Sequence, residues 1–130
     1  QKQPTTLNGN IVTTSKIEKL KNSYAFTSGL YFNDKMFRAS FNKIIEKAKY
    51  YRFGGDCYMY GMLATGLIDI VIEDTLKAWD YMALVPVIEG AGGIVSDKYN
   101  NAITLNSDGS FVATANPQLH EEVIEILKSN

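Results

Sequence analysis

One acidic residue, Asp80, lies beside Trp79 at the start of a mostly apolar segment that runs to Gly93. A carboxylate at the mouth of a buried helix is costly unless a positive group lies opposite it. A metal ion or a cationic substrate is the natural partner for such a carboxylate. We therefore expect segment 78–93 to form one wall of a binding site, built on a core helix.

Two predicted strand-to-helix junctions carry the other residues that could do chemistry. In the first, residues 52–58, Gly54 and Gly55 would let a ligand approach the backbone, and the next helix offers free amide donors. The second, residues 73–80, follows a strongly apolar strand, so its carboxylates should lie at the sheet edge where ligands of open α/β sheets bind. Together the junctions would place five charged side chains around one cleft: Arg52, Asp56, Glu73, Asp74 and Asp80.

Each of these residues also has a purely structural explanation. Asp56 could only cap the following helix, and Arg52 could pair with Asp56 or Asp74. Glu73 and Asp74 could be solvated loop charges, which spacing alone favours. Asp80 could be explained by the helix dipole, because it lies in a first helical turn. Spacing by itself leaves these alternatives open.

Two other reactive residue types carry no visible motif. His120 has no cysteine or acid at metal-ligand spacing, so we expect a surface position on the last helix. Cys57 has no basic partner nearby, so we expect it to be buried and inert.

Length and composition limit the class of protein. A chain of 130 residues is large enough for one domain with a real core. The net charge of -1 gives no reason to expect nucleic acid or an anionic membrane as a partner. No apolar run approaches the roughly 20 residues needed to span a bilayer. A single cysteine excludes an internal disulfide and fits a reducing compartment, so a cytoplasmic enzyme is expected.

The elements that must position the site alternate along the chain. Asn8-Gly9 predicts a hairpin turn, and apolar residues at helical spacing predict a helix over 34–49. Further strands are predicted at 24–28, 50–53, 67–72, 94–96 and 111–115, and further helices at 56–65, at 78–91 with a kink or break at Pro86, and from Asn116 onward. This alternation predicts a layered α/β sandwich.

The central motifs resemble those of a known enzyme family. Trp79-Asp80 followed by Ile88-Glu89-Gly90-Ala91-Gly92-Gly93 is similar to the second signature of the inositol monophosphatase family of magnesium-dependent phosphatases, although Gly90 is an insertion in the usual Glu-Ala-Gly-Gly. Residues 52–58 and Leu84-Val85-Pro86 bring the pattern closer to the histidinol-phosphatase branch. The resemblance covers nearly the whole chain, from the Asn8-Gly9 hairpin to the final helix.

The resemblance implies roles for individual residues. Asp80 stands where the family places a carboxylate ligand of the catalytic Mg²⁺, and Glu73 matches an acid that contacts the leaving alcohol. Asp56 stands where inositol enzymes usually carry a small residue, so its charge would favour the cationic histidinol phosphate. The resemblance also implies metal-assisted hydrolysis of a small-molecule phosphate ester, and a homodimer. The residues expected to bind substrate are Arg52, Gly54, Gly55, Asp56 and Glu73.

The sequence lacks part of the metal-binding pattern that the resemblance implies. The family's other metal ligands belong to an earlier signature, Asp-Pro-Ile/Leu-Asp-Gly-Thr with an upstream glutamate, which this sequence lacks. One carboxylate cannot hold magnesium, which requires octahedral oxygen ligation. With Gln1 as first residue, this predicts that residues 1–130 are the C-terminal domain of the phosphatase and inactive alone. Two alternatives remain: a phosphatase acting on inositol phosphate or another sugar phosphate, and a non-catalytic interaction module.

Overall fold

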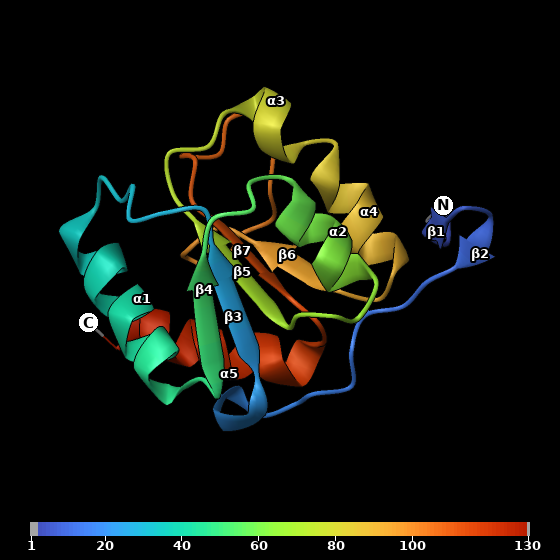
Figure 1. Ribbon diagram of the computed structural model, residues 1–130. Coiled ribbons are helices and arrows are strands. Elements are labelled where there is room, and N and C mark those ends of the chain that lie inside the picture. Colours follow the sequence, from blue (N-terminus) through green and yellow to red (C-terminus); the bar gives the residue numbers. More distant parts are fainter. Residues whose placement is uncertain (1–2, 130) are drawn as a thin grey trace.

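A computed structural model describes residues 3–129, which are organised around a five-stranded mixed sheet (Figure 1). The strand order is β4-β3-β5-β7-β6. β3, β4 and β5 run parallel, whereas β7 is antiparallel to both β5 and β6. The strand bounds are β3 Tyr24–Thr27, β4 Tyr50–Phe53, β5 Ile70–Glu73, β6 Ile94–Ser96 and β7 Phe111–Thr114.

Helices cover both faces of this sheet. α1 and α5 pack together on one face, and α2 and α4 pack together on the other (Figure 1). This arrangement confirms the predicted layered α/β sandwich. The helix bounds are α1 Lys35–Lys47, α2 Tyr58–Ala64, α3 Ala78–Tyr81, α4 Leu84–Gly90 and α5 Pro117–Lys128, with a short 3₁₀ turn at Leu20–Asn22.

The predicted turn and cap signals act as expected. Asn8 and Gly9 have φ of 53° and 83°, and they join β1 (Thr6–Leu7) to β2 (Asn10–Ile11) in an antiparallel hairpin. The Asp34 side chain accepts hydrogen bonds from the first amides of α1, and the Asn116 side chain accepts one from Leu119 N. Both caps satisfy amides that a helix leaves without internal partners.

The predicted helix over 78–91 is two helices. α3 ends at Tyr81 and α4 begins at Leu84. Pro86 explains the break, because it has no N–H and its ring would clash with the carbonyl of Met82, four residues earlier. The expectation of a core helix is therefore correct only for α4, which buries Ile88; in α3, Trp79 is 81% exposed.

The inserted glycine of the signature has a packing reason. The N-terminal segment crosses the end of α4, where Thr5 N donates to Gly90 O at 3.2 Å and Thr14 N donates to Ala91 O at 2.9 Å. A Cβ added at Gly90 would lie 2.5 Å from Gln3 O, which is closer than atoms can approach. Gly90 therefore permits contact between the two backbones.

The central strand β5 contributes buried residues to the hydrophobic core. Every residue of β5 is buried, as predicted for a central strand, although the strand begins at Ile70 and Leu67 is exposed. No helix among the described residues is long and apolar enough to cross a membrane.

Candidate functional site

The carboxyl ends of β3, β4 and β5 lie at one edge of the sheet because the three strands are parallel. The loops that follow them, together with α3, border a cleft of about 480 Å³. Ligands of open α/β sheets bind at this edge, so the cleft is the candidate site. Its lining residues are Thr27, Ser28, Gly29, Tyr31, Asp56, Cys57, Tyr60, Glu73, Asp74, Thr75, Leu76, Trp79, Asp80 and Leu84.

The cleft is acidic. It is lined by four carboxylates, those of Asp56, Glu73, Asp74 and Asp80, and by no lysine, arginine or histidine among the described residues. The two predicted junctions therefore do converge on one cleft. A cluster of negative charges attracts cations and repels anions, so the arrangement favours a positively charged ligand group.

Glu73 and Asp74 are buried, so their interpretation as solvated loop charges is wrong. Glu73 ends β5 and is 6% exposed. Ser28 Oγ donates a hydrogen bond to Glu73 Oε1. Burial raises the pKa of Glu73 above its usual value, hydrogen bonds from Ser28 and Tyr60 oppose that rise, and the nearby charge of Asp56 adds to it. Glu73 is therefore a carboxylate whose charge is costly until a cation lies beside it.

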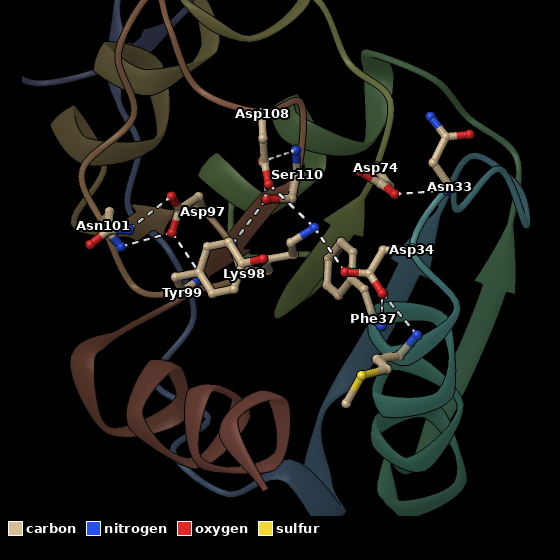
Figure 2. Close-up of polar contacts among 11 residues, drawn as sticks. Asn33, Asp34, Phe37, Asp74, Asp97, Lys98, Tyr99, Asn101, Asp108 and Ser110 are labelled. Atoms are coloured by element: carbon tan, nitrogen blue, oxygen red, sulfur yellow. Dashed lines mark hydrogen bonds and ion pairs between the residues drawn. The ribbon is translucent and has the colours of Figure 1, made fainter. Parts of the chain in front are cut away.

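The loop between β3 and α1, residues 28–34, is anchored over the cleft by two sets of contacts (Figure 2). Asn33 N donates to Asp74 Oδ2 at 2.9 Å. The Lys98 ammonium lies 3.0 Å from Asp34 Oδ2 and 3.2 Å from Asp108 Oδ2. Burial alone would lower the pKa of Lys98, but hydrogen bonds to the two aspartates raise it above its usual value. Lys98 is therefore a permanent cation that joins this loop to the segment between β6 and β7.

Asp56 reaches the cleft through an unusual backbone. Gly54, Gly55 and Asp56 have φ of 93°, 109° and 44°, so three successive residues adopt left-handed conformations. Glycine adopts these without strain, and aspartate tolerates them better than most residues. The helix α2 begins at Tyr58, and its N-cap position is held by Cys57 without a side-chain capping bond, so Asp56 is not the capping residue. The two glycines shape this loop and do not themselves line the cleft.

Arg52 lies outside the cleft, contrary to the expected grouping. It is exposed on the edge strand β4, where its Nε donates to Tyr50 Oη at 2.6 Å. Its guanidinium lies over the Tyr50 ring, 5.4 Å from the centroid. These contacts, rather than an ion pair with Asp56 or Asp74, account for its position.

Asp80 is exposed at the cleft, where its Oδ2 accepts a hydrogen bond from Lys77 N at 2.7 Å. Its charge is therefore not buried, and the predicted burial cost is absent. In residues 3–129, no three histidine, cysteine, aspartate or glutamate side chains converge as metal ligands. Magnesium requires about six oxygen ligands. The described residues consequently do not complete a magnesium site, and Asp80 could supply only part of one.

Cys57 and His120 are both placed contrary to expectation. Cys57 is exposed and lines the cleft. His120 is 5% exposed, with Nε2 lying 2.9 Å from Ser96 Oγ and Nδ1 lying 2.9 Å from Thr114 Oγ1. Burial lowers the pKa of His120 to about 4. Both expectations rested on neighbours in sequence, whereas burial depends on packing against distant strands.

Sequence reasoning missed Ser28 and Tyr60 as cleft residues. The signal for Ser28 was present, because Ser28-Gly29 follows a predicted strand in the way that the two recognised junctions do. Tyr60 lies within α2, and no local pattern distinguishes it from the helix's other aromatic residue, Tyr58.

Comparisons with known proteins agree on one family. Residues 1–130 match the sequence profile of the Inositol monophosphatase family. Bifunctional phosphatase IMPL2, chloroplastic, from Arabidopsis thaliana is 34% identical over 131 aligned positions, covering 95% of this chain and 38% of the relative. A Chlorobaculum parvum histidinol-phosphatase is 27% identical over 104 positions, covering 79% of this chain and 40% of the relative.

A comparison with solved structures also finds a member of this family. An inositol monophosphatase from Zymomonas mobilis superposes with a TM-score of 0.92 at 36% identity, covering 97% of this chain and 50% of that one. The chain thus spans half or less of the length of these relatives.

Proposed function

Because the chain belongs to the inositol monophosphatase family, we propose that the whole protein is a phosphomonoesterase acting on the phosphate ester of a cationic amino alcohol. Histidinol phosphate is the substrate that fits best. The reaction would consume one water and release histidinol and inorganic phosphate.

The acidic cleft carries this proposal. Its four carboxylates repel a phosphate group but favour an alcohol portion that carries positive charge. Histidinol is cationic at its amine and its imidazole, so each cation could pair with a carboxylate. The Chlorobaculum parvum relative, which is named a histidinol-phosphatase, supports the same substrate.

Individual residues then have distinct tasks. Asp56 and Glu73 would accept hydrogen bonds from the cationic groups of the alcohol, and Gly54 and Gly55 would hold Asp56 in its left-handed conformation. Asp80 would supply one oxygen ligand to magnesium, with the remaining ligands coming from outside the described residues.

Replacing Asp56 with asparagine tests the substrate assignment. Asparagine keeps the size and tolerates the φ of 44°, whereas alanine would add backbone strain. We expect the kcat/KM for histidinol phosphate to fall about 10- to 100-fold relative to that for inositol 1-phosphate, the usual value of a charge-assisted hydrogen bond. Steady-state assays of the whole protein with both esters measure this ratio.

Glu125→Gln is a suitable control, because Glu125 lies on α5, outside the cleft, and is exposed. An unchanged ratio in Asp56→Asn would contradict the proposal. It would favour the alternative of an inositol phosphate or sugar phosphate enzyme, which the similarity to the Zymomonas mobilis protein supports. A whole protein that turns over none of these esters would favour the interaction module.

The isolated 130-residue chain provides a separate test. Since its described residues do not complete a magnesium site, we expect it to show no magnesium-dependent release of phosphate from histidinol phosphate. Measurable turnover by the purified chain would show that residues 1–130 form a complete active site and that the assignment to a C-terminal domain is wrong. The homodimer implied by the resemblance and the cytoplasmic location expected from the single cysteine stay predictions.

A further inference from the structure

The central strand β5 has a buried carboxylate at each end, and a serine hydroxyl donates a hydrogen bond to each of them. Asp69, directly before β5, is 5% exposed and accepts from Ser15 Oγ. Glu73, the last residue of β5, is 6% exposed and accepts from Ser28 Oγ. A charge taken out of water is costly unless hydrogen-bond donors replace the water. Each serine therefore stabilises a buried charge, but the two pairs lie in different surroundings.

The Asp69 pair is explained by the fold. Asp69 Oδ1 accepts from Ser15, and Asp69 Oδ2 accepts from Tyr24 N at 2.8 Å. Tyr24 is the first residue of β3, so this carboxylate joins the starts of two neighbouring parallel strands. Neither Ser15 nor Asp69 lines the cleft. Both oxygens of Asp69 are thus occupied by groups of the protein, in a structural role.

The Glu73 pair lies at the other end of the strand, where both of its members line the cleft. A carboxylate offers about four acceptor positions. The hydrogen bonds from Ser28 and Tyr60 therefore leave Glu73 with capacity to accept from a ligand in the cleft. The bond to Ser28 also fixes the direction in which this carboxylate points.

No positive side chain in the cleft neutralises Glu73. The titratable groups that line the cleft with it are Tyr31, Asp56, Cys57, Tyr60, Asp74 and Asp80. Burial raises the pKa of Glu73, and the side-chain hydrogen bond from Ser28 is the strongest influence that lowers it. Without this donor Glu73 would be protonated more readily, and a neutral carboxyl group binds a cation less strongly than a carboxylate does.

We propose that Ser28 is a positioning residue, which holds Glu73 as an oriented carboxylate that accepts a hydrogen bond from the cationic alcohol portion of the substrate. The proposal rests on the proposed function, because it assumes that a cationic phosphate ester occupies the cleft. It gives a role in recognition to the loop between β3 and α1, which the contacts of Asn33 and Asp34 hold in place (Figure 2).

Ser28→Ala in the whole protein tests this role, since it removes the donor and keeps the backbone. We expect the acid-side loss of kcat/KM for histidinol phosphate to move upward by about 1 pH unit, because Glu73 must be ionised to bind the cation. The substrate's own ionisations act equally on both proteins, so the difference reports the enzyme. At neutral pH the KM should rise about 3- to 10-fold, while kcat changes less than about twofold.

Three comparisons separate positioning from a loss of structure. Ser28→Thr keeps a hydroxyl and should restore the pH dependence and bring the KM to within about twofold of the wild-type value. Ser15→Ala is the matched control, because it removes the same kind of bond outside the cleft. It should lower the melting temperature but change neither the KM nor the pH dependence. The inhibition constant of inorganic phosphate, which carries no cationic group, should be the same in all four proteins.

An unchanged KM and pH dependence in Ser28→Ala would overturn the role of Ser28 and leave the proposed function intact. The same changes in Ser15→Ala, no recovery in Ser28→Thr, or an equal rise in the phosphate inhibition constant would also overturn it. A wild-type protein with a higher kcat/KM for inositol 1-phosphate than for histidinol phosphate would instead show that the proposed function has failed, and this role with it.

Discussion

Replacing Asp80 with asparagine should lower the magnesium-dependent phosphatase activity of the whole protein by about 100- to 1000-fold, because charge stabilisation by a bound metal contributes several kcal/mol. Asparagine removes only the charge. Its side-chain oxygen can still accept the hydrogen bond that Asp80 Oδ2 accepts from Lys77 N at 2.7 Å, so the start of α3 should be preserved.

Two measurements separate the metal role from the capping role. The magnesium concentration that gives half-maximal activity should rise in Asp80→Asn, because the protein would retain one weaker ligand in place of a carboxylate. The free energy of unfolding should stay within about 0.5 kcal/mol of the wild-type value, because the substituted residue is exposed and the asparagine side chain still caps α3. Retained activity at the wild-type magnesium requirement would show that Asp80 serves only as a helix cap.

Lowering the pH from 6.5 to 4 should destabilise the fold through His120. Burial lowers the pKa of His120 to about 4 in the folded chain, whereas in the unfolded chain its pKa is the ordinary value of 6.5. Above the pKa of the unfolded chain, the histidine is neutral in both states and its burial does not reduce the free energy of unfolding. As the pH falls from that pKa toward the pKa of the folded chain, only the unfolded chain binds the proton, so the free energy of unfolding decreases. The full loss is about 3 kcal/mol, at about 1.4 kcal/mol per pH unit.

Urea denaturation between pH 8 and pH 4 measures this dependence, and His120→Asn is the control. The variant should be less stable at pH 8, because one of the bonds to Ser96 and Thr114 is lost, but its stability should vary less with pH. Glu73 acts in the opposite direction, because its raised pKa favours protonation in the folded state. The difference between the wild-type and variant curves therefore isolates His120. Parallel curves would contradict the assigned origin of the effect.

Local chemistry made much of the fold predictable. The Asn8-Gly9 turn, the caps at Asp34 and Asn116 and the break before Pro86 each depend on groups within a few residues of one another. The motif around Trp79-Asp80 likewise identified the family, since its spacing is contained in one segment. The prediction that two junctions share a sheet edge was correct because parallel strands place their carboxyl ends together.

Burial was decided only by the tertiary structure. Glu73, Asp74 and His120 are buried and Cys57 is exposed, opposite to the interpretation of each from its neighbours in sequence. Burial depends on which distant elements cover a residue: Ser28 lies against Glu73 across 45 positions, and Ser96 lies against His120 across 24. The sequence alone thus determined the family, the elements and the acidic character of the site. Only the tertiary arrangement, in which three parallel strands end at one edge of the sheet beside α3, decided which carboxylates share the cleft.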